Sequence, residues 1–508
     1  MKRWHKVLAA SIIAFIFITV AIVKSTGRSN ANPISPTPGT PSHDKDREQS
    51  CDANLDVSLA WHPPSKNNVN DLDGVINGKG VYGFIFNSSA GSHDTYNYCN
   101  MPRVHPDTYP AAKDGYKLEY VEVIHRHHKR TPYASNAFPV EEDTWFCDDE
   151  RLFFGGEPTS GPGSAKTSWK VYRTDSNPLT PLGFVGTCQF PQITGDGLID
   201  SYQHGVDIGN VYQEKLRFLP KKFDQDALTY RVTNNVITSQ VASRVIVGMW
   251  PGRSNLDHEL LIQQATIDSL EPNYPCGAAS KLLASYGPGS TSEDWIAHLE
   301  QAAPLKKRLD RLSGVDPDAE DWSNSWDHYF DNLSTRLCHQ KDLPCSVDDD
   351  SECVTLDEAE KVFRLGEYEY SFIYRDSPFS LRASVASYGI WMGELAQNLR
   401  THMDGKSASP RPQYRHNFAH DGSIARLLSI LQVDQMVWPG KGAEVVFELF
   451  SKQGCYYLRV LWSGQVLRSS HPAFEHMDML PVGTFLAYVD GLVGVQGSKI
   501  PEMCKATL

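Results

Sequence analysis

The 508-residue chain lacks several features that mark common classes of function. No two of its ten cysteines are spaced as C-x-x-C, so the sequence does not indicate a zinc ribbon or a thioredoxin-type redox site. Positive charge is scarce too, since the formal net charge is -13, which argues against nucleic acid as a partner. No internal repeat is recognisable. An anionic substrate must therefore be captured by a local group of basic side chains.

Long hydrophobic runs are rare, and one stands out at the amino terminus. Residues 7–23 carry no charge, follow Lys2, Arg3 and Lys6, and precede Lys24. Basic residues before an apolar run are typical of a signal peptide or a type II signal anchor. The run is short for a membrane span, and no A-x-A cleavage site follows it. We expect residues 1–24 to be one of the two, with a lean towards membrane anchoring by residues 7–23, and the rest of the chain to be lumenal or extracellular.

The cysteines agree with this placement. They are even in number and spread over the chain, which in an oxidising compartment predicts up to five disulfides whose pairing stays open. The N-x-S triplets at Asn87 and Asn332 fit a glycoprotein of the secretory pathway. Residues 25–50 hold four prolines and few apolar side chains, which predicts a linker.

The body of the chain has the pattern of an α/β protein. "KLEYVEVI" (117–124) and "ALTYRV" (227–232) are rich in β-branched and aromatic residues and predict strands. Helical spacing follows over 233–250, with Thr233 or Asn234 as the expected cap. Residues 251–405 read as mostly helical, and strand patterns return at 414–421 and 455–467. We predict an α/β core from 51–250 and 406–508, interrupted by a helical cap domain at 251–405.

The most unusual stretch is "VIHRHHKR" (123–130), with three histidines and three basic residues. A nuclear-import or polyanion-binding patch is disfavoured because the stretch ends an apolar strand behind a secretory leader. A metal site is disfavoured because His416 and His420 have helical spacing within a strand-like segment, and two arginines beside His127 would repel a cation. We therefore predict no metal ligands here.

Strand-end geometry favours another interpretation. In open α/β sheets, ligands bind beyond the carboxyl ends of the strands. There, Arg126 and Arg130 would flank His127, and guanidinium groups match phosphate oxygens. The neighbouring positive charge favours a neutral imidazole with a free lone pair. Such a nucleophile suits attack on a phosphate, and His420 with Asp421 offers an acid for the leaving alcohol.

Several stretches resemble the histidine acid phosphatase family, the branch of the histidine phosphatase superfamily that includes phytases. "RHHKRTP" (126–132) resembles the motif R-H-G-x-R-x-P, and "AHDGSIARLLSIL" (419–431) resembles the H-D motif with its helix. Residues 193–212 and 230–248 resemble intervening family segments, and residues 337–354 look like a cysteine-bearing loop of relatives that act on 2-phosphoxylose. The likeness covers about residues 117–490.

The resemblance implies a three-layer α/β/α core and a two-step hydrolysis of phosphate monoesters. His127 would form a phosphohistidine, Arg126, Arg130 and His420 would bind the phosphoryl oxygens, and Asp421 would protonate the leaving oxygen. No metal or cofactor is implied. Since an unperturbed aspartic acid has a pKa of about 3.9, we expect an acidic optimum. The expected substrate is a small-molecule or glycan phosphate ester.

Two positions depart from the family pattern. His128 stands where the motif has glycine, and would add a phosphate donor if the loop keeps its shape. Ile237 stands where a third phosphate-binding arginine is expected. Arg244 lies about 10.5 Å further along the helix, so Asn234, Asn235 and the helix amino terminus are nearer substitutes.

Three functions therefore stay open: a working acid phosphatase, an impaired relative that binds a phosphorylated ligand, and a glycan-binding module. We favour the enzyme because the nucleophile and the acid are both present.

Overall fold

The computed structural model describes residues 51, 53–82, 96–139, 143–148, 150, 152–153, 168–172, 176–177, 186–252, 258–404 and 411–505. The predicted leader at 1–24, the linker at 25–50 and the sequon at Asn87 lie outside these residues. None of the helices in the described ranges combines the length and apolar character that a membrane-spanning segment needs.

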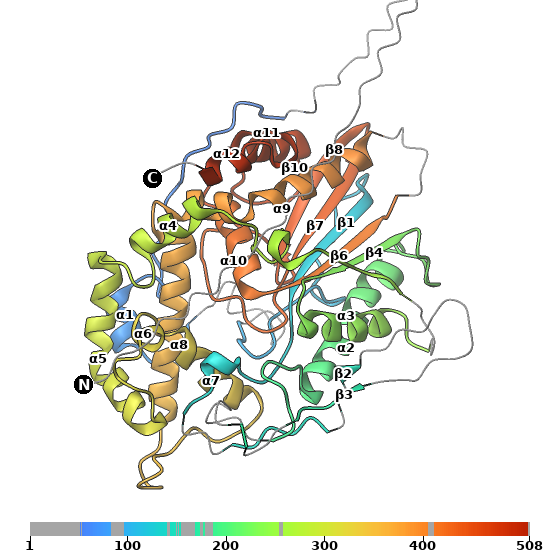
Figure 1. Cartoon of the computed structure of the whole chain (residues 1–508). Helices are drawn as coiled ribbons and strands as arrows, with labels where there is room; N and C mark the ends of the chain where they lie inside the picture. Colours follow the sequence, from blue (N-terminus) through green and yellow to red (C-terminus); the bar gives the residue numbers. More distant parts are fainter. Residues whose placement is uncertain are drawn as a thin grey trace, which may run out of the picture. The chain divides into compact units, whose positions relative to one another are not determined.

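One mixed sheet forms the centre of the protein (Figure 1). Its strand order is β10–β8–β7–β1–β6–β4–β5, with the short β9 paired to β8. The half from β1 to β5 is parallel, and the half from β7 to β10 is antiparallel. The strands are β1 (Lys117–Arg126), β4 (Leu228–Val232), β5 (Leu260–Ile262), β6 (Tyr414–Ala419), β7 (Glu444–Lys452), β8 (Cys455–Trp462), β9 (Gln465–Val466) and β10 (Leu480–Pro481). A separate hairpin pairs β2 (Leu152–Phe153) with β3 (Ser168–Trp169).

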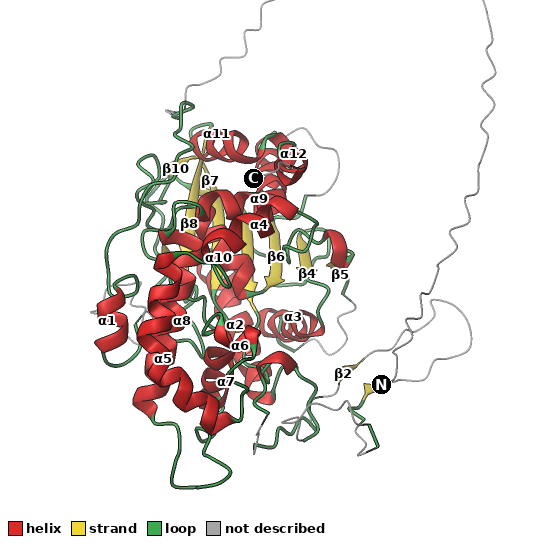
Figure 2. Ribbon diagram, turned by 60° about the vertical axis from the view of Figure 1, so that its left-hand side comes forward, coloured by secondary structure: helices red, strands yellow, loops and turns green. Residues whose placement is uncertain are grey.

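Helices cover both faces of this sheet (Figure 2). Alternate residues of β1 point to opposite faces, so Tyr120 and Ile124 join one apolar core while Val121 and Val123 join another. The first core is completed by α9 (Ser380–Met403), α10 (Asp421–Ile430) and α11 (Val482–Val493), the second by α2 (Gly195–Gly209) and α3 (Val236–Met249). The predicted three-layer α/β/α core is confirmed.

A third apolar core lies within the helical segment predicted as a cap. Leu309, Leu333 and Phe363 meet there from three helices. The helices of this region are α4 (Gly277–Tyr286), α5 (Glu293–Ser313), α6 (Glu320–Ser323), α7 (Asp327–Cys338) and α8 (Leu356–Ser371). Within 251–405, however, β5 pairs with β4 and α9 packs on the sheet. The cap boundaries at 251 and 405 stay a prediction.

The remaining elements are short. They are α1 (Leu72–Asn77), α12 (Ile500–Lys505) and the 3-10 or π turns η2 (Ala134–Asn136), η3 (Asn210–Lys215), η4 (Ala265–Ile267), η5 (Phe372–Asp376) and η6 (Val495–Gly497).

The ten cysteines form five disulfides, as predicted. The pairs are Cys51–Cys455, Cys99–Cys338, Cys147–Cys188, Cys276–Cys504 and Cys345–Cys353.

The sequon at Asn332 is not available for glycosylation in the folded chain. Asn332 lies on α7 and is fully buried. Its amide donates to the Asn136 carbonyl at 2.8 Å and accepts from Arg336 at 3.1 Å. The triplet therefore belongs to the packing of α7, which does not favour a glycan at Asn332.

Candidate active site

The reactive side chains follow the ends of three neighbouring parallel strands. Arg126 at the end of β1 pairs with Ala419 at the end of β6, and Val232 at the end of β4 pairs with Phe418. The backbone N–H of His127 donates to the Ala419 carbonyl at 3.2 Å. His127, Thr233 and His420 are the next residues of the three strands, so they meet at one edge of the sheet.

His127 presents a bare ring nitrogen at this edge. Its Nδ1 lies 2.9 Å from the His128 carbonyl oxygen, which can only accept, so Nδ1 carries the proton. The lone pair is therefore on Nε2, 3.4 Å from Arg130 Nε. Burial, with the nearby charges of Arg130 and Lys441, lowers the pKa of His127 well below its ordinary value. The imidazole is therefore neutral, and its role as nucleophile stays a prediction.

Arg130 is held in place by the helical segment. Asp331 on α7 accepts two hydrogen bonds from its guanidinium, at 3.0 and 3.2 Å, and the Tyr133 ring lies 4.2 Å from it. Although burial would raise the pKa of Asp331, Arg130 and Lys441 hold it well below its usual range. With these contacts in place, Arg130 Nε donates to His127 Nε2 at 3.4 Å.

Arg126 pairs with the predicted acid. Its Nη2 lies 2.6 Å from Oδ2 of Asp421, and that oxygen also accepts from Trp438 Nε1 at 2.9 Å. Burial would raise the pKa of Asp421, but Arg126 and Trp438 lower it below its usual value. In the ligand-free protein Asp421 is therefore ionised, whereas the sequence interpretation has it protonated at the start.

His420 lies beside the nucleophile. Its ring centroid is 5.5 Å from that of His127, and its Nε2 is 2.9 Å from the Thr233 hydroxyl. Glu271 Oε1 is 3.6 Å from the same nitrogen. Burial lowers the pKa of His420 to about 4, so its imidazole is neutral at neutral pH. The side chains of Glu271 and Asp421 are partly exposed, which opens the cluster to solvent on this side.

Lys441 is a third cation of the cluster that the sequence did not reveal. Its side chain is 4% exposed, and its Nζ lies 3.5 Å from Asp331 Oδ1 without making a hydrogen bond to any described residue. Burial and the two arginines lower the pKa of Lys441. Ile237, the expected position of a third arginine, is fully buried in the core between the sheet and α3. Lys441 thus adds a third basic side chain to the cluster, whereas Ile237 adds none.

The predicted accessory residues lie elsewhere. Asn234 is exposed, and Asn235, rather than Thr233 or Asn234, caps α3 by accepting from Ile237 N at 3.3 Å. His128 turns its ring nitrogen towards His125 and His204, away from the phosphate side. This orientation does not favour His128 as a phosphate donor, and that role stays a prediction.

The loop accommodates His128 through a glycine. Gly442 has φ 73°, and a Cβ there would lie 2.5 Å from the His128 ring. Its N–H donates to the His127 carbonyl at 3.1 Å. The absence of a side chain at Gly442 therefore makes room for the imidazole that replaces the motif glycine.

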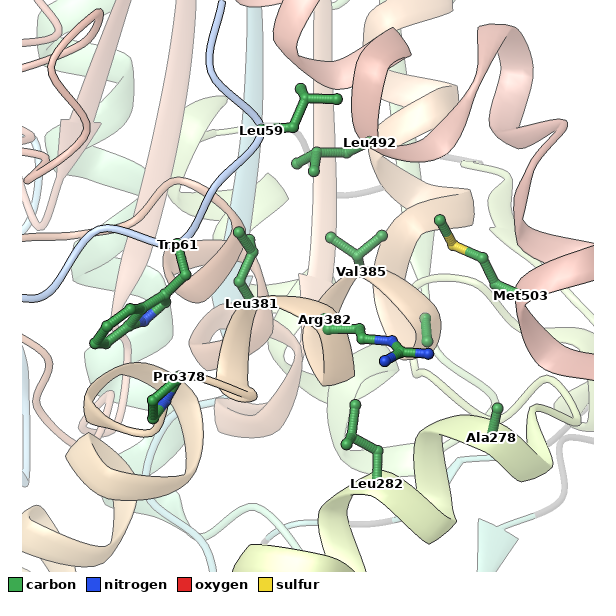
Figure 3. Close-up of a pocket in the computed structure, with 11 residues that line it drawn as sticks. Leu59, Trp61, Ala278, Leu282, Pro378, Leu381, Arg382, Val385, Leu492 and Met503 are labelled. Atoms are coloured by element: carbon green, nitrogen blue, oxygen red, sulfur yellow. The ribbon is translucent and has the colours of Figure 1, made fainter. Parts of the chain in front are cut away.

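An apolar cavity lies apart from these residues (Figure 3). It has a volume of about 430 Å³ and is lined by residues that include Trp61, Leu381, Leu492 and Met503. None of its lining residues belongs to the histidine–arginine cluster. It offers apolar contact and one cation, Arg382, but no nucleophile.

Comparison with known proteins identifies the family of the chain. The profile of the histidine phosphatase superfamily (branch 2) matches residues 117–463. Counting factor 60 of Dictyostelium discoideum is 24% identical over 379 residues, covering 72% of this chain and 84% of that protein. Human 2-phosphoxylose phosphatase 1 is 20% identical over 373 residues, covering 72% and 75%.

Two solved structures are also similar. The phytase of Klebsiella sp. ASR1 has a TM-score of 0.47 at 15% identity, covering 79% of this chain and 98% of that one. The phytase of Hafnia alvei in complex with tartrate has a TM-score of 0.49 at 16% identity, covering 76% and 99%. Since the family profile spans more than half of the sequence, this chain belongs to branch 2 of the histidine phosphatase superfamily.

Proposed function

We propose that the protein hydrolyses phosphate monoesters through a phosphohistidine at His127. The observation that carries the proposal is the unprotonated Nε2 of His127, which accepts a long hydrogen bond of 3.4 Å from Arg130 Nε beside the Arg126–Asp421 pair. A buried neutral imidazole can approach a phosphate among cations without losing its lone pair. The cations offset the charge that develops on the phosphoryl oxygens.

Binding of the substrate would free the side chain of Asp421 from Arg126, so that Asp421 can act as the acid. A phosphate dianion that enters the cluster competes with Asp421 for Arg126. Once phosphoryl oxygens share the guanidinium, the attraction that lowers the pKa of Asp421 weakens, and burial raises that pKa instead. Asp421 can then hold the proton that the leaving oxygen needs. Apo geometry alone does not argue against this role.

The proposed reaction has two steps, transfer of the phosphoryl group to His127 and its hydrolysis. The Nε2 lone pair of His127 forms a bond to phosphorus while the bond to the ester oxygen breaks, and Asp421 gives its proton to that oxygen. The resulting carboxylate then takes a proton from a water molecule whose oxygen attacks the phosphohistidine. The nitrogen–phosphorus bond breaks and inorganic phosphate leaves. None of these steps uses a metal ion.

The proposed substrate is a small-molecule or glycan phosphate ester met in the secretory pathway. The five disulfides support an oxidising compartment. A human relative is named for action on 2-phosphoxylose. That name supports a phosphorylated sugar as the first compound to test.

A second candidate function is capture of a phosphorylated ligand without turnover. It is favoured by Ile237, which removes an expected arginine, and by Asp331, which engages two donors of Arg130. In that case the cluster would bind phosphate, and the arginine at 130 would be too restrained to follow the transferring phosphoryl group.

The test compares two esters with different leaving groups. Wild type should release phosphate from p-nitrophenyl phosphate and from an alkyl phosphate at acidic pH. His127→Ala should lose both activities. Asp421→Asn should lose about 10²–10⁴-fold on the alkyl ester but much less on p-nitrophenyl phosphate, because p-nitrophenolate leaves without a proton.

The exposed His476 provides a control, since His476→Ala should keep wild-type rates. Turnover that survives His127→Ala would contradict the proposal. Saturable phosphate binding that needs His127, without turnover of any ester, would establish the second candidate instead.

A further inference from the structure

A second cluster of histidines lies next to the candidate active site. His125 comes from β1, His128 from the loop that follows it, and His204 from α2, and all three are fully buried. His128 Nε2 is 3.2 Å from His125 Nε2 and 3.1 Å from His204 Nδ1. The three nitrogens lie within 4.8 Å of one another. They converge on one point between the sheet and α2.

The cluster does not have enough protons for these contacts. Glu444 Oε2 lies 2.9 Å from His204 Nε2, so the neutral ring carries its proton there and leaves Nδ1 bare. His128 Nε2 faces two neighbours but can hold only one proton. If His128 Nε2 holds no proton, its lone pair faces the lone pair of His204 Nδ1. If it holds a proton, the unprotonated nitrogens of His125 and His204 must share that proton. Either way, one short contact lacks a proton of its own.

We propose that His125, His128 and His204 bind a divalent transition-metal ion of the zinc class. Imidazole nitrogens are preferred ligands of such ions. Tetrahedral coordination with bonds of about 2.0–2.1 Å places ligand nitrogens about 3.3–3.4 Å apart, close to the two short separations. A cation at the centre receives all three lone pairs and removes the conflict between them.

Two of the three histidines have an outer partner of the kind that holds a ligand histidine in place. Ligand histidines typically donate their outer N–H to a carboxylate or another acceptor. Glu444 serves His204 in this way. His416 Nε2 lies 3.1 Å from His125 Nδ1, and the Tyr414 hydroxyl lies 2.8 Å from His416 Nδ1. His128 Nδ1 is buried and makes no hydrogen bond to a described residue. The ring of His128 therefore makes its polar contacts through Nε2, with His125 and His204.

The metal would be structural and not part of the reaction. The carbonyl of His128 accepts from His127 Nδ1, while the His128 ring points to the cluster. An ion held by His128 therefore fixes the peptide that sets the tautomer of the nucleophile. The ion would also join the end of β1 to α2. The sequence analysis predicted no metal ligands because it weighed only the spacing of His416 and His420 and the arginines beside His127. His204, 76 residues from His128, is brought to the cluster only by the fold.

The metal content of the purified full chain tests this. Tag-free protein folded in the presence of zinc and then passed over a chelating resin should retain about one zinc ion per chain. With cobalt in place of zinc, it should show the visible absorption of a tetrahedral cobalt centre with nitrogen ligands. His128→Gln and His204→Gln should each lose the ion and the absorption, and Glu444→Gln should weaken affinity about 10–100-fold.

A matched control comes from the cap region. His298 is also fully buried, with its Nε2 2.7 Å from Glu369, but it lies outside the cluster. His298→Gln should keep the metal. Wild-type protein that folds with zinc or cobalt present and yet contains no stoichiometric ion overturns the proposal, even where the variants fail to fold. So does a metal that both His128→Gln and His204→Gln retain. Neither readout depends on phosphatase activity.

Discussion

At the scale of single residues, the charges around His127 are paired before any ligand arrives. Arg126 meets Asp421, and Arg130 meets Asp331. Buried charges of this kind are tolerated because each has a partner. Under the proposed function a phosphate exchanges with a carboxylate, and Lys441 Nζ and Arg126 Nε, which make no hydrogen bond in the described part of the chain, are donors ready to receive it.

Replacing Lys441 should weaken the handling of the phosphoryl group. Lys441→Met keeps the length of the side chain but removes one charge-assisted hydrogen bond, a loss of about 1.5–3 kcal/mol or about 10- to 150-fold in kcat/KM. Steady-state kinetics with a dianionic ester measure the effect. The exposed Lys221 gives the control Lys221→Met, which should behave as wild type. An unchanged kcat/KM in Lys441→Met would remove Lys441 from the site.

Trp438 should set the pH range over which Asp421 can act as an acid. Its indole N–H stabilises the carboxylate form of Asp421, so its loss raises the pKa of that carboxyl. Trp438→Phe keeps an aromatic ring between Phe330 and Tyr370, whose centroids lie 3.9 and 4.0 Å from the indole. The falling limb of activity should therefore move to higher pH by about one unit. A limb at the wild-type pH, or one moved to lower pH, would contradict the assignment of the acid.

The residues of the site differ in how far sequence could reveal them. Arg126 and His127 come from one short motif and His420 and Asp421 from another, each placed directly after a strand. Asp331 is 201 residues from its partner Arg130 and belongs to no motif. It meets the site only because α7 folds against the end of the sheet, which local pattern cannot show.

At the scale of elements, α2 and α3 approach more closely than side chains would allow. A Cβ on Gly205 would lie 2.1 Å from the Val245 carbonyl oxygen, and one on Gly248 would lie 2.1 Å from that of Tyr202. The two glycines therefore form the contact between the helices. This contact holds α2, which carries His204, against α3, and both helices pack on the face of the sheet that includes β1.

Filling that contact should destabilise the fold. Gly205→Ala should lower the free energy of unfolding by about 1–3 kcal/mol, because a methyl group meets backbone that cannot move away. Denaturant unfolding followed by fluorescence measures this. Gly277 at the start of α4 has nothing within 4 Å of its missing Cβ, so Gly277→Ala is the matched control. Equal stability of the two variants would mean that the helices separate at little cost.

Strands and helices were predictable where their spacing is regular. The patterns at 117–124, 227–232 and 414–421 predicted β1, β4 and β6, and the helical spacing after β4 predicted α3. β7 escaped because most of it is buried on both faces and lacks alternation. β5, with three residues, is too short for any pattern. The cap of α3 was misplaced because Thr233 turns to His420 instead.

At the scale of the whole molecule, disulfides join distant segments to the site. Cys99–Cys338 fastens the last residue of α7, the helix that carries Asp331. Cys51–Cys455 ties the first described residue to the start of β8 across 404 positions. The even count of cysteines predicted five bridges, but the pairing depends on distances that exist only in the folded chain.

The covalent intermediate at His127 tests the central claim most directly. Protein mixed with a rapidly reacting ester, denatured in alkali to preserve phosphohistidine and digested, should show one added phosphoryl group on the peptide that contains His127. The group should be absent from His127→Ala and from wild type without ester. Turnover in wild type with no phosphorylated His127, or with the phosphoryl group on another residue, would contradict the account.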